Sequence, residues 1–282
     1  MVLRLDAQPL QKRMEARVAR KRPTVADLRA LKGKRQLTML RYFSLDEAKA
    51  AEAAGIDIAS VPPALVTNPA YRKVAPSVFS MTGKTHLESG AADKYLRFAG
   101  QMIEAGADAL YCSGSLRTVE YLAREYIPVV GHVGLVPARA TWTGGYRAVG
   151  KTAQSAVALF HECRRYQDAG AFAIEIEVVP VEVATAISER LDILLWSMGS
   201  GPGCDAQYLF AEDILGENRG HVPRHAKVYR NFAGEYDRLQ LERIKAFSEF
   251  RADVNTGAFP EKKTVLHMEA GECEAFLKAL ST

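Results

Sequence analysis

The chain has 282 residues, of which 48% are hydrophobic and 25% charged, so it is long and apolar enough for one large α/β domain. The net charge of +4 is small and the basic residues are spread along the chain, which argues against a nucleic-acid-binding protein. Its four cysteines are far apart and no apolar run has transmembrane length. We therefore expect a reduced, cytoplasmic protein that does not enter a membrane.

Residues 1–35 are charged and periodic, and they predict an N-terminal helical arm ahead of a second unit, residues 36–282. The second unit begins with QLTMLRYF (36–43), which predicts a strand. A helix should follow from Ser44 to Gly55, because Ser44 and Glu47 have capping-box spacing and glycine suits a helix C-cap.

Short apolar strands alternate with amphipathic helices through the rest of this unit. A helix, a glycine and a strand recur in AAGIDI (53–58), EAGADALYC (104–112) and DAGAFAIEI (168–176). The other predicted strands are IDIASV (56–61), SVFSM (77–81), IPVVGHVG (127–134) and ILLWSMGS (193–200). Strands this apolar, with room for a helix between most neighbours, favour a parallel sheet covered by helices.

The length fits a closed (β/α)8 TIM barrel, and a doubly wound open sheet is the alternative. Only ALVTNPAYRKVAP joins Pro63 to the strand at 77–81, so the second outer helix is expected to be lost or replaced by a loop. From Pro223 onward the sequence predicts polar C-terminal helices with a turn at 255–260. In a barrel, functional groups gather where strands run into the following loops.

Two glutamates lie in AFAIEIEVVP (171–180), a segment that is otherwise typical of a buried strand. Glu175 and Glu177 are two residues apart, so both should point to the same face of the sheet. A carboxylate rarely sits in a core unless it is paired or takes part in chemistry. The sequence offers no partner for Glu175, which should lie one layer deeper in the barrel than Glu177.

Six segments occur together in order and at regular family spacing: TVADLRALKGK (24–34), GHVGLVP (131–137), AFAIEIEVVP (171–180), GSGPGCDAQYLFAEDILG (199–216), PRHAKVYRNF (223–232) and GAFP (257–260). With these segments the chain resembles the ketopantoate hydroxymethyltransferase family, in the phosphoenolpyruvate mutase and isocitrate lyase superfamily of barrels. The resemblance covers nearly the whole chain from about Lys21.

The resemblance implies a transferase that works on a small 2-oxo acid, as a step toward pantothenate. Members of that family add a one-carbon unit from 5,10-methylenetetrahydrofolate to C3 of the acid. They use Mg²⁺ to chelate the acid, and they form large homo-oligomers. Glu177 aligns with the glutamate expected to remove the C3 proton. A carboxylate held away from water can serve as such a base.

The chain departs from the family where the metal is bound. The three acids expected at strand ends align with Pro63, Ser80 and Ser113, and Mg²⁺ prefers anionic oxygen ligands, so a family-type metal site is doubtful here. Without the ion, an enolate must be stabilised by donors or fixed cations. Our candidates for substrate binding are Arg41, Lys84 and His132 at strand ends, with Ser80 and Ser113 as pocket-lining hydroxyls.

These observations leave three hypotheses for the function of the protein. The first is a hydroxymethyltransferase-like enzyme that uses Glu177 as its base. The second is a divergent paralogue with metal-independent C–C lyase, aldolase or hydrolase chemistry, for which Lys84 could form a Schiff base with a 2-oxo acid. The third is a non-catalytic barrel that binds a metabolite or a protein partner.

Overall fold

A computed structural model describes residues 20–84 and 90–281. The chain forms two compact units, one that ends at Arg230 and one that begins at Asn231, and each is described by itself. Residues 1–19 of the expected helical arm lie outside the described residues, so a helix there stays a prediction. No helix among the described residues is long and apolar enough to cross a membrane.

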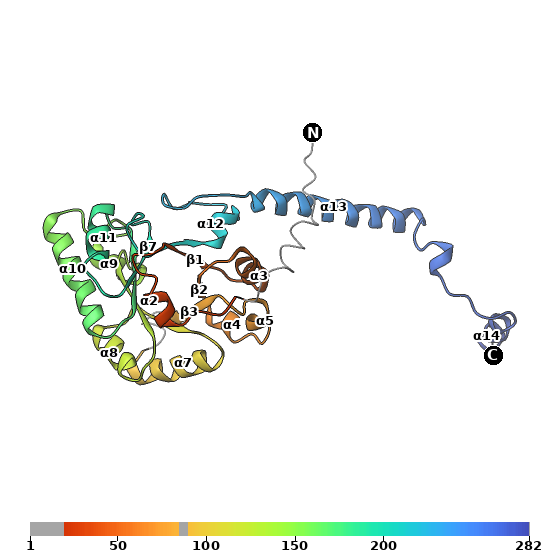
Figure 1. Ribbon diagram of the computed structural model, residues 1–282. Helices are drawn as coiled ribbons and strands as arrows, with labels where there is room; N and C mark the ends of the chain where they lie inside the picture. The colour runs from red at the N-terminus through yellow and green to blue at the C-terminus, as the bar shows by residue number, and fades with distance from the viewer. Residues whose placement is uncertain (1–19, 85–89, 282) are drawn as a thin grey trace. The chain divides into compact units, whose positions relative to one another are not determined.

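The first unit is a closed barrel of parallel strands arranged in chain order, with β8 hydrogen-bonded back to β1 (Figure 1). This confirms the predicted TIM barrel over the open sheet. The strands are β1 (Leu37–Arg41), β2 (Ile58–Val61), β3 (Phe79–Lys84), β4 (Ala109–Cys112), β5 (Val129–Gly134), β6 (Ala173–Glu177), β7 (Leu194–Met198) and β8 (Ala206–Phe210).

The longer helices lie outside the strands and the short ones sit in the connections (Figure 1). Helix α3 has the predicted Ser44–Glu47 capping box and ends at Gly55 in the left-handed conformation. The longer outer helices are α3 (Leu45–Ala54), α7 (Ala92–Glu104), α8 (Leu116–Arg124), α10 (Ala153–Asp168) and α11 (Val181–Ser188). The shorter ones are η1 (Pro137–Arg139), α9 (Ala140–Thr143) and α12 (Ala211–Leu215).

The second outer helix is replaced, as the short connection predicts. Two single turns, α4 (Pro63–Val66) and α5 (Tyr71–Val74), fill its place between β2 and β3. Buried Tyr71 anchors the second turn, because its hydroxyl is hydrogen-bonded to those of Tyr42 and Ser80. The barrel thus stays closed with much less chain over this strand pair.

Strand β8 is missing from the strands predicted above. It is short and only partly buried, and it follows β7 after residues 199–205 without an intervening helix. This connection passes close to α11: a Cβ on Gly201 would lie 2.4 Å from Val181, and one on Gly203 would lie 2.0 Å from Thr185 Oγ1. Glycine at these positions lets the chain return beside α11 without a crossover helix.

Apolar side chains form one layer inside the barrel and a second between the strands and the helices. The inner layer includes Leu28 of α2 (Val25–Arg29), which packs with Leu37, Met39 and Trp196. Because Leu37 begins β1, α2 covers the amino ends of the strands. The opposite end, where the strands finish, carries polar side chains that include Arg41, His132 and Glu177.

The unit that begins at Asn231 is helical, in line with the C-terminal helices that the sequence predicts after Pro223. Its helices are α13 (Phe232–Thr256), η2 (Lys262–Thr264) and α14 (Glu272–Ala279). Helix α13 ends at Gly257 in the left-handed conformation, within the predicted turn. No residue of α13 or α14 is buried.

We predict that Gly203→Ala lowers the free energy of unfolding by about 1–3 kcal/mol, because the added methyl group must displace Thr185. Gly220→Ala is the matched control, since a Cβ there meets nothing within 4 Å, and it should change stability by less than about 0.5 kcal/mol. Urea unfolding of both variants makes the comparison. Equal stability of the two variants would contradict the close packing of this loop on α11.

Candidate functional site at the carboxyl ends of the strands

His132 of β5 lies between the two glutamates of β6. Its Nε2 is 3.0 Å from Oε2 of Glu177, and its Nδ1 is 3.8 Å from Oε2 of Glu175. The hydroxyl of Tyr111 is hydrogen-bonded to Nδ1 at 2.8 Å. The contact with Glu177 is an ion-pair distance without hydrogen-bond geometry, so Nε2 keeps an open hydrogen-bonding position.

The strand register explains why these groups meet. In the pairing of β5 with β6, His132 is opposite Glu175 and Gly134 is opposite Glu177. Alternation along β6 then turns both glutamates toward the barrel interior, as the spacing predicts. His132 is therefore the neighbour of Glu175 that the sequence does not reveal, because the pair is formed across strands.

The backbone directly after Glu177 is strained. Val178 has a φ of 52°, a region that β-branched residues avoid at a cost of about 1–3 kcal/mol. Two hydrogen bonds hold it there, from its own N–H to Met198 O and from Val149 N–H to its carbonyl oxygen. The turn that carries the Glu177 carboxylate is thus fixed by both neighbouring segments.

Glu175 is the more deeply placed of the two acids. Burial raises its pKa to about 7, the positive charge of His132 opposes this rise, and the negative charge of Glu177 adds to it. Arg41 makes a smaller contribution that lowers the pKa. Near neutral pH this carboxyl group is thus close to its own titration point.

A second group of polar side chains lies across the barrel on β1, β2 and β8. Arg41 Nη1 donates to Ser60 Oγ at 3.0 Å, and its guanidinium lies 5.2 Å and 5.8 Å from the ring centroids of Phe43 and Phe210. Burial raises the pKa of Tyr208, and the charges of Glu175 and Arg41 both act on that hydroxyl. These electrostatic contacts join the two groups into one site at the mouth of the barrel.

The structure brings some predicted site residues together and separates others. Glu177, His132 and Arg41 belong to the site, and Ser113 is buried directly after β4 with its Oγ unpaired among the described residues. Ser80 instead faces the helices, where it is hydrogen-bonded to Tyr71. Lys84 also points outward, with Nζ 5.1 Å from the ring centroid of Phe98 on α7.

Several residues of the site are absent from our sequence-based candidates. Tyr111 and Tyr208 reach the interior from β4 and β8, and alternation within ALYC and AQYLF is the signal that could have found them. His225 is half-buried against Gly199. Burial lowers the pKa of His225, and the negative charge of Glu177 acts in the opposite direction. Its position depends on the irregular segment after α12, which no sequence period predicts.

The site does not fit the magnesium ion that the resemblance implies. Among residues 20–84 and 90–281, no group of three or more His, Cys, Asp or Glu side chains is arranged to hold a metal ion. Of the three aligned positions, Pro63 begins α4, Ser80 faces away from the interior and only Ser113 lies near the site. A divalent cation prefers several anionic oxygens, which these positions do not supply.

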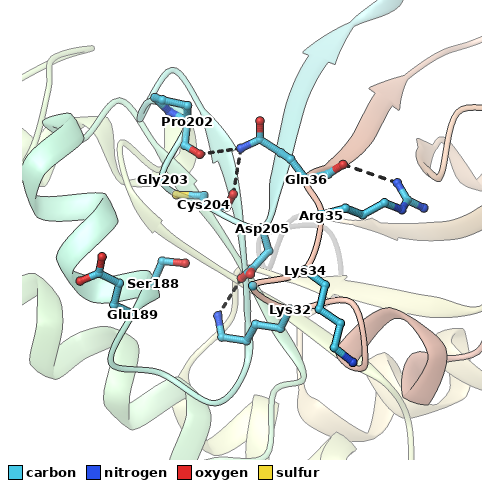
Figure 2. Close-up of a pocket in the computed structure, with 11 residues that line it drawn as sticks. Lys32, Lys34, Arg35, Gln36, Ser188, Glu189, Pro202, Gly203, Cys204 and Asp205 are labelled. Carbon is cyan, nitrogen blue, oxygen red and sulfur yellow. Dashed lines mark hydrogen bonds and ion pairs between the residues drawn. The ribbon is translucent and has the colours of Figure 1, made fainter.

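A cavity of about 500 Å³ lies elsewhere, where the segment after α2 meets the loop before β8 (Figure 2). Two of the cations that line it are paired, Lys32 with Asp205 at 2.8 Å and Arg35 with Asp57 at 2.7 Å. Gln36 Nε2 donates to the carbonyl oxygens of Pro202 and Cys204. These bonds fasten α2 to the amino ends of the strands, so we assign this cavity a structural role.

Fold and site together define a TIM-barrel protein with a carboxylate–imidazole site at the carboxyl ends of its strands. Residues 83–262 match the family described as ketopantoate hydroxymethyltransferase. The chain is 33% identical to 3-methyl-2-oxobutanoate hydroxymethyltransferase from Thermotoga neapolitana, over 86% of this chain and 95% of that protein. It is 36% identical to the protein of that name from Halalkalibacterium halodurans, over 68% of each. The chain therefore belongs to the ketopantoate hydroxymethyltransferase family.

Solved structures support the fold. A 2,3-dimethylmalate lyase of the PEP mutase/isocitrate lyase superfamily matches 92% of this chain and 98% of its own, with a TM-score of 0.50 and 13% identity. An oxaloacetate acetylhydrolase matches 83% of this chain and 97% of its own, with a TM-score of 0.53 and 11% identity. The family match begins at residue 83, after the region that holds Pro63 and Ser80.

The raised pKa of Glu175 predicts a pH-dependent stability. Below about pH 4.5 the carboxyl is protonated in both folded and unfolded chains, whereas above about pH 7 folding must bury its charge. Glu175→Gln should therefore gain stability relative to the parent as pH rises, by about 2 kcal/mol more at pH 8 than at pH 5. Urea unfolding at both pH values, with exposed Glu182→Gln as control, measures this difference. A gain that does not change with pH would contradict the burial of an ionising group.

Proposed function

We propose that this protein acts on a small 2-oxo acid by removing the proton beside its carbonyl group and then transferring a one-carbon unit to that carbon. The observation that carries the proposal is the Glu177 carboxylate at the end of β6, fixed by the Val178 turn and 3.0 Å from His132 Nε2. Family membership supports the same chemistry, because the relatives are named 3-methyl-2-oxobutanoate hydroxymethyltransferases.

In the proposed reaction, Glu177 takes the C3 proton and the C–H electron pair moves toward the 2-oxo oxygen to give an enolate. Arg41 and His132 are the fixed donors that stabilise the growing negative charge. Water opens the methylene bridge of 5,10-methylenetetrahydrofolate, our proposed co-substrate, and both C–N bonds break, so that the carbon is released as formaldehyde and tetrahydrofolate leaves. The enolate carbon then adds to the formaldehyde carbon, and the proton held by Glu177 passes to the resulting alkoxide oxygen to give the hydroxymethyl group.

The described residues favour a metal-independent form of this reaction over a magnesium-dependent one. They provide no cluster of acids for the ion, while a guanidinium and an imidazole occupy the mouth of the barrel. An aldolase that uses a Lys84 Schiff base has less support, because Lys84 points outward to Phe98. A lyase or hydrolase on a small carboxylic acid, or a purely binding role, remains the alternative.

We also propose that the protein is a cytoplasmic homo-oligomer. Its four cysteines are all free, which suits a reducing compartment. Leu239, Phe247, Phe250 and Val254 recur at helical spacing along α13, with exposed fractions of 40%, 71%, 56% and 48%. An apolar stripe on so long a helix is typical of a surface that packs against another helix or subunit.

Glu177→Gln should reduce exchange of the C3 proton of 3-methyl-2-oxobutanoate for deuterium by about 10²–10⁴-fold, since the amide cannot accept the proton. NMR of the substrate in D₂O follows the exchange, and Glu182→Gln on the exposed face of α11 should match the parent. Exchange in the parent should persist in EDTA. Exchange that requires added Mg²⁺ would contradict the metal-independent form, and no exchange in either condition would exclude 3-methyl-2-oxobutanoate as the substrate.

A triple variant with glutamate in place of Leu239, Phe247 and Phe250 should dissociate the oligomer, because charged side chains on the stripe oppose burial of that surface. Light scattering coupled to size-exclusion chromatography gives the mass. A triple variant with glutamate at Ser248, Ala252 and Asn255 adds the same charge to exposed positions off the stripe and should keep the parent mass. Identical masses for both variants would remove α13 as the interface.

A further inference from the structure

Glu175 is a buried acid that the proposed proton abstraction does not use. Its side chain is only 5% exposed and points into the barrel one level below Glu177. One carboxylate oxygen, Oε2, faces His132 Nδ1 at 3.8 Å. The other, Oε1, has no hydrogen-bond partner among the described residues.

The donors around Glu175 are engaged elsewhere. The Tyr111 hydroxyl is hydrogen-bonded to His132 Nδ1, and Arg41 Nη1 donates to Ser60 Oγ. Tyr111 and Tyr208 both feel the charge of Glu175, so they flank it, yet neither forms a hydrogen bond to Oε1. Oε1 therefore remains unpaired among the described residues although donors lie around it.

Other open polar atoms gather at the same place. Two strands beside β6 contribute such atoms: Trp196 Nε1 on β7 is buried without a hydrogen-bond partner among the described residues, and His132 Nε2 on β5 makes no hydrogen bond although it lies 3.0 Å from Glu177. His132, Glu175 and Trp196 are direct register partners, so their side chains project from one row across three strands. Trp196 offers an indole N–H, which can only donate, and ionised Glu175 can only accept.

Buried polar groups are almost always paired, and a set of open ones in one row indicates that a ligand completes them. A hydroxyl group matches this row, because it can donate to a carboxylate oxygen and accept from an indole N–H. A methyl group would leave both atoms unpaired.

We propose that Glu175 determines substrate specificity, and that its Oε1 accepts a hydrogen bond from a hydroxyl group on the side chain of the 2-oxo acid. The preferred substrate then carries a hydroxyl group where 3-methyl-2-oxobutanoate has only methyl groups. This inference rests on the proposed function, since it assumes that a 2-oxo acid binds with C3 near Glu177. The depth of Glu175 sets the order of groups: the carbon that loses its proton lies at the mouth and the hydroxyl lies below it.

The size of the preference can be anticipated. A site built to hydrogen-bond a substrate hydroxyl rejects the analogue that lacks it strongly, because its own buried groups are left unpaired, whereas an apolar pocket discriminates weakly. We expect a preference of about 100-fold or more for the hydroxylated acid.

Two acids of nearly equal shape test this: 4-hydroxy-2-oxobutanoate and 2-oxopentanoate, which differ by a hydroxyl in place of a methyl group. Deuterium exchange at C3 of each acid, corrected for uncatalysed exchange, gives kcat/KM, and 3-methyl-2-oxobutanoate is measured alongside. The parent protein should favour the hydroxylated acid. The ratio is kcat/KM for the hydroxylated acid divided by kcat/KM for 2-oxopentanoate. Glu175→Leu should bring this ratio to unity or below, whereas Glu175→Gln, which keeps an acceptor oxygen, should give an intermediate ratio. The exposed control Glu182→Gln should leave the ratio unchanged.

Exchange of 2-oxopentanoate as fast as that of 4-hydroxy-2-oxobutanoate in the parent would overturn the inference while leaving the proposed function in place. No exchange of any of the three acids would overturn both. If Glu175→Leu does not fold, as judged by circular dichroism, the parent ratio and the Glu175→Gln ratio decide. A Glu175→Gln ratio equal to that of the parent at every pH, with Trp196→Phe also unchanged, would show that the hydroxyl binds elsewhere and would overturn the role of Glu175.

Discussion

The site depends on one imidazole ring held between two carboxylates. His132 contacts Glu177 through Nε2 and faces Glu175 through Nδ1, while the Tyr111 hydroxyl supports the same side of the ring. The deeper carboxylate, Glu175, is costly to ionise inside the barrel, and the nearby imidazole offsets part of that cost. The barrel register brings the three side chains together, and the strained turn at Val178 keeps Glu177 at the mouth.

This arrangement also gives the departure from the family a physical meaning. Where magnesium would supply positive charge, the mouth of this barrel has Arg41 and His132, and the positions aligned with the family acids are proline and serines. A fixed cation can stabilise an enolate without a metal, provided that it is aimed at the developing charge. The region before residue 83, which holds two of those positions, lies outside the family match and also carries the shortened β2–β3 connection.

Much of the fold could be predicted from the sequence, because the apolar strands, the helix–glycine–strand repeats and the Ser44 cap are local signals. Strand β8 could not, since AQYLF is short, partly exposed and follows a connection without a helix. The site was predictable where alternation alone decides, as for Glu177 on its strand. Ser80 and Lys84 show the limit: both sit on β3 and face the helices, because the barrel decides which face of the strand points inward and the segment itself does not. The contact of His132 with Glu175 needs the register between strands, which no single segment encodes.

A crystal structure of the protein with a bound 2-oxo acid would locate the ligand without relying on turnover. We expect electron density for the acid between Arg41 and the Glu177 carboxylate, above Glu175, at the carboxyl ends of the strands. A 2-oxo acid bound only in the cavity beside Lys32 and Asp205, with the region around His132 closed by protein side chains, would show that this site does not bind the substrate.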